Sequence, residues 1–558
     1  MIVGCVFSKY TALVKSLHLT QHYMGADSSD ASGAVSNPTS GPTAERLEDL
    51  AYAKSQAELG GGLKRLEAIR VSGRGTARDR IRWLLDPESF IEIDTFITHR
   101  ASEHNLHMLK HLGDGVVAGH GTIDGRRVYC FAQDFSVHGG SMGEMHAKKI
   151  TKVVEMAERS KVPLLCIWDG GGQRAHDGIP ALGGTGELLD HMVSCSGRIP
   201  IISIVLGPVV GVSALAAGLA DFTILGREHG QLFLSSPLET PEFASGELIA
   251  DEIGGANMHA SRSGIACLIA EDEEEAMALA AEILAHFPDH FDAMPPHMPS
   301  GDPIERANEN LETFVPDNPN RPYDMTKVIE EVVDDGAFLE LFEAYAENIV
   351  IGLARMDGMP VGIIANQPKV LAGCLDIDAS IKASRFIRTC DAFNIPLVTF
   401  EDVPGFLPGV IQEWGGIIRH GAKLLYAYAE ATVPKLTLIT RKAYGGAYLA
   451  MSCKHLRSDY NIAWPTAELA VMGAEGAVNV IHRREINAVE EAERENVRQN
   501  LVSDYKNKFG DPYVAARNGW LDDVIEPAET RLRLCRALRL LRNKKEWTPS
   551  KKHGNIPL

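Results

Sequence analysis

Residues 434–452 read PKLTLITRKAYGGAYLAMS, and this stretch predicts the fold of the chain. An apolar run, 436–439, follows a proline and precedes basic residues, which is typical of a buried strand. Gly445 and Gly446 then open a helix-compatible segment, 447–451. Glycines at such a turn allow positive φ and close approach of a ligand, and the first amides of a helix have no intrahelical acceptor. The stretch predicts either a plain tight turn or a backbone site for negative charge.

The same unit occurs twice in the chain. Residues 200–206, PIISIVL, form a second apolar run, and a glycine-bounded turn, 207–212, precedes small residues that suit a helix. Farther upstream, 162–172 (VPLLCIWDGGG) resembles 395–405 (IPLVTFEDVPG). Helix-like segments precede both copies, at 144–159 and 378–394. A duplicated unit of strand, helix, strand and glycine turn indicates two sites of related chemistry that face each other.

Composition excludes several classes of protein. The 558 residues carry 55 basic and 74 acidic side chains, a net charge of −19, which argues against a nucleic-acid partner. Nine cysteines without a CxxC pair are interpreted as reduced thiols, and no metal site is expected. No apolar run reaches the length of a membrane span, so no membrane partner is expected.

The amino-terminal residues differ from the rest in composition. Residues 1–43 are predicted to be a disordered tail, rich in Ser, Gly, Ala and Pro from 27 onward. The first 26 residues contain no arginine, which argues against a mitochondrial presequence. They also have no basic residue ahead of the apolar start, which argues against a signal peptide. We therefore expect a cytoplasmic protein, with the mitochondrial matrix as the alternative. A Pro- and Asn-rich segment, 288–320, is the predicted domain boundary.

Charged and imidazole side chains offer further sites. Five arginines lie close together in sequence: Arg65, Arg70, Arg74, Arg78 and Arg80. They form either a solvated helical face or a phosphate-binding entrance for a nucleotide-bearing substrate. His138 and His146 have no spacing to a nucleophile or carboxylate that would make a triad, and we interpret both as structural. A hairpin is predicted at Asp124-Gly125.

Several motifs together resemble the carboxyltransferase (beta) subunits of biotin-dependent acyl-CoA carboxylases of the propionyl-CoA carboxylase type. They are GGGLKR (60–65), TARDRI (76–81), GDGVV (113–117), GGSMGEMHAK (139–148), PGFLPG (404–409), GGIIRHGAK (415–423), RKAYGGAY (441–448) and AWPTAE (463–468). The resemblance covers residues 44–555. It implies an α/β fold of two tandem crotonase-like domains of the ClpP/crotonase β-β-α superhelix type, 44–300 on the acyl-CoA side and 301–558 on the biotin side.

The resemblance also implies the chemistry: a carboxyl group passes from carboxybiotin to the α-carbon of a short-chain, propionyl-like acyl-CoA. The biotin ureido nitrogen takes the α-proton, so the protein needs no base of its own and instead holds two oxyanions with backbone amides. The implied catalytic amides are Gly211, Val212, Gly446 and Ala447. Substrate-binding positions are Gly171, Gly172, Arg74, Arg78 and Leu449. Cofactor-binding positions are Gly405, Phe406, Tyr444 and Gly445.

Partners are implied by the same resemblance. The chain has no biotinyl-lysine motif and no ATP-grasp phosphate loop. A biotin carboxylase and a biotin carboxyl carrier subunit are therefore implied, and only that partner uses ATP and Mg. In the family the site lies between two copies of the chain, and three such dimers form a hexamer.

The acyl side departs from the family pattern. The family's GPCAGG is GPVVGV at 207–212, its DSGGAR is DGGGQR at 169–174, and Leu449 stands where aspartate is frequent. These departures predict a non-standard or broadened acyl-CoA range. Three alternatives remain: the alpha subunit of a biotin-dependent acyl-CoA decarboxylase, a catalytically silent assembly paralogue, and a crotonase-type hydratase or isomerase.

Overall fold

The computed structural model describes residues 42–103, 106–237, 242, 245–316, 318, 321–546 and 548–558. The predicted tail, 1–43, lies outside these residues except for its last two, which begin helix α2 (Pro42–Glu58). The chain divides into two compact units, Met1–Ala53 and Lys54–Leu558. The second unit holds both copies of the repeat.

The first copy builds an eight-stranded sheet of order β1-β2-β3-β4-β5-β6-β8, with β7 paired to β5. Its strands are β1 (Ile91–Glu92), β2 (Val116–Ile123), β3 (Arg126–Gln133), β4 (Leu164–Gly170), β5 (Ile201–Val210), β6 (Phe222–Gly226), β7 (Gln231–Phe233) and β8 (Leu268–Ala270). The predicted hairpin joins β2 and β3, with Asp124 and Gly125 both at positive φ. Strands β3 to β6 run parallel.

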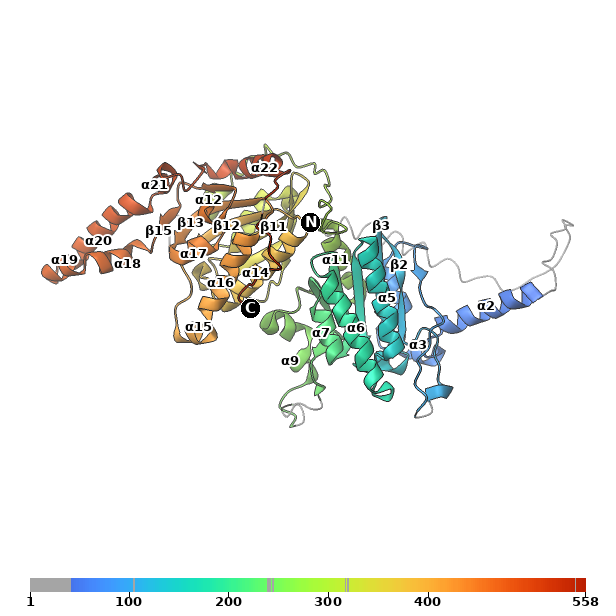
Figure 1. Ribbon diagram of the computed structural model, residues 1–558. Helices are drawn as coiled ribbons and strands as arrows, with labels where there is room; N and C mark the ends of the chain where they lie inside the picture. The colour runs from blue at the N-terminus through green and yellow to red at the C-terminus, as the bar shows by residue number, and fades with distance from the viewer. Residues whose placement is uncertain are drawn as a thin grey trace. The chain divides into compact units, whose positions relative to one another are not determined.

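Helices cover both faces of this sheet, which explains why its strands are continuous apolar runs. Along β4, Leu164, Cys166 and Trp168 belong to the core on one face. Helices α5 (Glu144–Ser160), α6 (Ile179–Cys195) and α7 (Val212–Gly218) pack there (Figure 1). Leu165 and Ile167 point to the opposite core, which α4 (Ala77–Leu84) and α11 (Glu273–His286) complete.

The second copy repeats this plan in a sheet of order β16-β14-β13-β12-β11-β10-β9, with β15 paired to β13. Its strands are β9 (Phe338–Leu341), β10 (Ile349–Met356), β11 (Met359–Asn366), β12 (Leu397–Val403), β13 (Lys435–Tyr444), β14 (Tyr460–Ala463), β15 (Glu468–Ala470) and β16 (Asp523–Val524). Helices α14 (Ile377–Ala392) and α16 (Ile417–Glu430) cover one face. Helices α13 (Met325–Val332) and α22 (Thr530–Leu541) cover the other.

The remaining helices are short or lie at the edges of these layers. They are α3 (Leu63–Val71), α9 (Ala250–Gly254), α10 (Ala256–Met258), α12 (Leu311–Phe314), α15 (Val410–Gly415), α17 (Gly445–Ala450), α18 (Ala474–Ile481), α19 (Arg483–Ala488), α20 (Arg494–Tyr505) and α21 (Pro512–Arg517). Residues 288–310, between the two copies, contain no helix or strand. In the described part of the chain, every helix is too short or too polar to cross a membrane.

The two copies match in irregular details as well as in topology. A three-residue left-handed turn follows β3 at 138–140 and β11 at 371–373, with φ between 48° and 77°. The pairing of β4 with β5 shifts register within 168–170, and the pairing of β12 with β13 shifts within 401–403. These shared irregularities, together with the shared topology, confirm the internal repeat. In the alignment of the two copies, Trp168 of the first corresponds to Glu401 of the second.

Candidate active site

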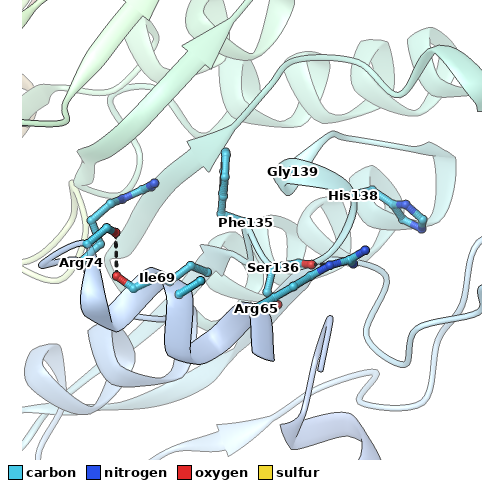
Figure 2. A pocket seen from close by; sticks show the side chains of 9 residues that line it. Arg65, Ile69, Arg74, Phe135, Ser136, His138 and Gly139 are labelled. Atoms are coloured by element: carbon cyan, nitrogen blue, oxygen red, sulfur yellow. Dashed lines mark hydrogen bonds between the residues drawn. The ribbon is translucent and has the colours of Figure 1, made fainter. Parts of the chain in front are cut away.

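A cavity of about 450 Å³ opens in the first copy between α3 and the loop after β3. Its lining residues are Arg65, Ala68, Ile69, Ser72, Arg74, Phe135, Ser136, His138 and Gly139. Figure 2 shows Arg65 and Arg74 on the side of α3, and Phe135 and His138 on the loop that faces them. A Cβ at Gly139 would meet no atom within 4 Å, so this glycine borders open space.

The structure separates the predicted arginine cluster into two groups. Arg65 donates to the Ser136 carbonyl at 3.1 Å, and the Arg74 guanidinium lies 4.9 Å from the Phe135 ring centroid. Both line the cavity. Arg78 instead forms an ion pair with Glu92 at 2.8 Å and is not among the lining residues. Of the two arginines predicted to bind substrate, Arg74 lines the cavity and Arg78 does not.

A buried ion network holds α3 and α4 against the sheet. Asp169, at the end of β4, pairs with Arg74 and with Arg80, the latter at 2.6 Å. Arg80 also pairs with Glu273 of α11 at 2.6 Å. Burial opposes the charge of Arg80, yet Asp169 and Glu273 raise the pKa of the guanidinium above its usual range. The network fixes one wall of the cavity.

We predict that Arg80→Leu lowers the free energy of unfolding by about 3–5 kcal/mol, because it leaves the Asp169 charge buried with less compensation. Arg80 and Asp169 side chains are each only 1% exposed. Thermal unfolding measures the change. Arg82→Leu on the same helix is the matched control: Arg82 is 69% exposed and its removal should cost less than about 0.5 kcal/mol. Equal melting temperatures for the two variants would contradict the prediction.

The two histidines singled out in the sequence have different environments. His146 is fully buried, and its ring contacts the Asp114 carbonyl at 3.0 Å and the Gln133 amide at 3.3 Å, in agreement with a structural role. His138 lines the cavity, with His111 at 5.5 Å between ring centroids. Burial, and then the charge of Arg174, lower the pKa of His138 to about 4. A neutral imidazole thus borders the cavity, a feature that the sequence reasoning did not anticipate.

The predicted glycines after β4 support this loop. The Gly171 N–H donates to the Gly139 carbonyl at 3.0 Å, and the Gly172 carbonyl accepts from the Met142 N–H at 2.8 Å. A Cβ at Gly172 would lie 2.9 Å from the Val210 carbonyl oxygen. These contacts place the 138–140 turn beside the end of β5.

A glycine at positive φ stands at the strand-to-helix turn of both copies. Gly211 after β5 has φ 71°, and Gly445 after β13 has φ 61°. The Gly211 N–H is not free, because it donates to the Phe233 carbonyl at 2.8 Å and extends the pairing of β5 with β7. When Gly211 is aligned with Gly445, Val212 and Ser213 correspond to Gly446 and Ala447. In the first copy this pair lies one residue after the pair implied by the resemblance, Gly211 and Val212.

The second turn faces open space bordered by Phe406. A Cβ built on Gly446 would meet only the Phe406 ring, at 4.0 Å, and one on Gly405 would meet nothing within 4 Å. The Tyr444 hydroxyl donates to the Glu468 carboxylate, whose other oxygen pairs with Lys506 at 3.0 Å. Leu449 on α17 is 41% exposed. The biotin-side residues implied by the sequence thus lie around one turn.

The side chains around the two turns are relevant to metal binding and to proton transfer. Among the residues that the structure describes, no group of three or more His, Cys, Asp or Glu side chains is arranged to hold a metal ion. Tyr444 is held by Glu468, and burial followed by this hydrogen bond raises the pKa of its hydroxyl. Both turns present backbone amides at the start of a helix, which is a favourable place for negative charge.

The chain is similar over most of its length to proteins of known activity. Residues 69–556 match the model of the carboxyl transferase domain family. The propionyl-CoA carboxylase beta chain of Roseobacter denitrificans is 48% identical over 512 residues, covering 92% of this chain and 99% of that protein. The methylmalonyl-CoA decarboxylase subunit alpha of Veillonella parvula is 47% identical over 514 residues, with the same coverage.

Solved structures agree with these sequence relatives. Transcarboxylase 12S, a hexamer assembly with methylmalonyl-coenzyme A and methylmalonic acid bound, matches with a TM-score of 0.90 and 44% identity over 94% of this chain and 100% of that one. This likeness confirms the α/β fold of two tandem crotonase-like domains. The chain therefore belongs to the carboxyl transferase family, together with the beta chains of propionyl-CoA carboxylases.

Proposed function

We propose that this chain is the carboxyltransferase subunit of a biotin-dependent acyl-CoA carboxylase and that it carboxylates the α-carbon of a short-chain acyl-CoA. The observation that supports this most is the duplicated turn: each copy presents the first amides of a short helix beside a left-handed glycine. Two such sets of amides match the two oxygens, of the thioester and of the ureido group, on which negative charge develops.

The residues of the second copy suit a biotin ring. Gly405 and Gly446 leave space that a Cβ would reduce, and Phe406 supplies an apolar wall beside it. When bound, carboxybiotin would supply both the carboxyl group and the base. The amides of Gly446 and Ala447 then hold the ureido oxygen, and Leu449, one turn along α17, limits the space for the acyl chain.

The first copy suits an acyl-CoA. Arg65 at the cavity carries positive charge toward the phosphates of the nucleotide portion, with Ser72 and Ser136 as polar neighbours. Arg74, whose charge is paired with Asp169, lines the same cavity. We place the amides of Val212 and Ser213 at the thioester oxygen. The Gln173 side chain donates to Ser213 Oγ at 3.1 Å and steadies the start of α7.

A second copy of the chain completes the site in this proposal. Large apolar side chains are exposed beside both turns, and isolated subunits rarely expose so many together. In the second copy of the repeat they are Val410, Ile411, Trp414 and Ile418; in the first they are Ile179, Leu182, Val193 and Leu215. We infer that the two sets meet between chains, and that the dimers assemble into a hexamer. A biotin carboxylase and carrier subunit, the user of ATP and Mg, is the other partner.

One alternative has a specific observation behind it. The same surfaces would support the reverse reaction, removal of a carboxyl group from an acyl-CoA onto biotin, and relatives of this kind share 47% identity with the chain. The direction of transfer depends on the partner subunits rather than on the two turns.

The test is a reconstitution. The purified chain is mixed with a biotinylated carrier–carboxylase subunit, ATP, magnesium and labelled bicarbonate, and fixation of label into acetyl-, propionyl-, butyryl- and methylcrotonyl-CoA is compared. We expect fixation into short-chain acyl-CoAs. Absence of label from every acyl-CoA, in an assembly that binds the carrier, would contradict the proposal. Release of label from methylmalonyl-CoA would then favour the decarboxylase.

A further inference from the structure

The layer between the second sheet and helices α16 and α17 contains buried polar groups that the proposed chemistry does not use. Thr399 bonds to the Tyr428 hydroxyl at 2.9 Å, and Thr437 donates to the Ser452 carbonyl at 2.7 Å. Other buried polar atoms in this region have no partner among the described residues. They are both carboxyl oxygens of Glu401, the Tyr448 hydroxyl, Ser452 Oγ and Asn461 Nδ2.

The internal repeat shows how unusual Glu401 is. The equivalent residue of the first copy is Trp168, whose indole N–H donates to Ser203 at 3.0 Å. In the second copy the residue that corresponds to Ser203 is Thr437, and its hydroxyl is already bonded to Ser452. The Glu401 side chain, which is smaller and polar, thus stands at the position of the Trp168 indole. It has no hydrogen bond that corresponds to the one between Trp168 and Ser203. A buried carboxyl group without a protein partner is costly, so it requires a ligand such as internal water.

No cation compensates a charge on Glu401 among the described residues. The groups that face it are Asp402 on β12, Tyr428 on α16, Tyr448 on α17 and Cys453 just beyond α17. The Arg441 guanidinium, on the neighbouring strand β13, is paired with Asp402 at 3.0 Å. Burial, and then the charge of Asp402, raise the pKa of Glu401 well above its usual range. This shift favours the neutral form of the carboxyl group, which can donate one hydrogen bond.

We propose that the buried Glu401 carboxyl group and the Tyr448 hydroxyl, bridged by internal water, form a positioning pair beneath the biotin-side turn. Tyr448 follows Ala447 directly in α17, so the position of its side chain sets the direction of the two amides before it. The proposal rests on the proposed function of that turn. Ionisation of Glu401 would place an unpaired charge under α17 and displace these amides, and small displacements of this kind lower rates strongly.

The sign of the pH effect is set by the raised pKa. Between the pKa of the unfolded chain and that of the folded chain, the folded state binds the extra proton. The free energy of unfolding therefore falls as pH rises through this window and is constant above the folded pKa. Glu401→Gln removes the titration, so its melting temperature should exceed that of the wild type by a margin that widens as pH rises above the ordinary pKa of a glutamate.

The experiment combines this measurement with carboxyl transfer in the full assembly at saturating acyl-CoA. We expect the wild-type kcat to fall on the alkaline side, Glu401→Gln to lose that fall, and Glu401→Leu to lower kcat about tenfold with the acyl-CoA KM unchanged. Glu340→Gln is the matched control. Burial raises the pKa of Glu340 to about 7, but it lies on β9, so it should change stability and leave the alkaline fall in place.

Each readout can overturn the proposal. An alkaline fall that persists in Glu401→Gln, or a wild-type kcat in Glu401→Leu, would contradict the positioning role. If the difference in melting temperature between Glu401→Gln and the wild type did not change with pH, the result would contradict a neutral carboxyl group at Glu401. Because melting does not depend on carboxyl transfer, it separates failure of this inference from failure of the proposed function.

Discussion

Gly446→Val should reduce carboxyl transfer by about two to three orders of magnitude without unfolding the protein. A Cβ at this position meets only the Phe406 ring at 4.0 Å, so the chain accepts a side chain there. The added methyl groups occupy the space in front of the first α17 amides, where the ureido oxygen is held in our proposal. Initial rates of label fixation and the melting temperature, measured on one preparation, test both parts.

Gly476→Val is the matched control for this variant. Gly476 lies in α18, and a Cβ there would lie 3.7 Å from Met472 Sδ, again without a clash. We expect this control to keep its carboxyl-transfer rate. If Gly446→Val retained more than about a tenth of the wild-type rate, the second turn would not be an oxyanion site.

Two inactive variants should restore activity when their chains are mixed. Val212→Pro removes one amide of the first turn, and proline fits because Val212 is the first residue of α7. Gly446→Val blocks the second turn. If each site joins the first copy of one chain to the second copy of another, a mixed dimer holds one intact site. Random exchange of equal amounts then gives about a quarter of the wild-type rate.

The measurement is label fixation before and after the two variants are unfolded and refolded together. The double variant, Val212→Pro with Gly446→Val in one chain, is the control, because its mixture with itself contains no intact site. Recovery near zero for the two single variants, with mixed oligomers present, would place each site within a single chain and contradict the dimeric arrangement.

The repeat and the main strands could be predicted because local patterns carry them. The matching segments 162–172 and 395–405 contain strands β4 and β12. The helices expected at 144–159 and 378–394 correspond to α5 and α14. These segments have long apolar runs or clear helical periodicity. The glycine turn at 445 was placed correctly for the same reason: a positive φ there requires the residue that the sequence supplies.

Other features depend on contacts between distant residues and were missed. Strand β5 runs on to Val210, through segment 207–210 that the sequence presented as a turn, because β7 pairs with it. The same pairing occupies the Gly211 amide. Helix α6 was not predicted because three glycines lie inside it, and its stability comes from packing on α5.

The cavity residue His138 shows the limit most clearly. Its spacing to other polar residues in the sequence matches no catalytic motif, and its place at the cavity depends on the left-handed turn at 138–140. The signal in the sequence that could have pointed to this turn was the repeat, because 138–140 (HGG) and 371–373 (LAG) occupy matching positions in the two copies.

The duplicated framework also bears on how such enzymes diverge. Both turns carry a glycine at positive φ, but the residue after it differs, Val212 in one and Gly446 in the other. Each half can therefore accumulate substitutions without altering the other. In our proposal, the half that meets the acyl group is free to adapt to a new metabolite while the half that meets the carrier is retained. Paralogous subunits with different substrates could then share one carrier protein within the same cell.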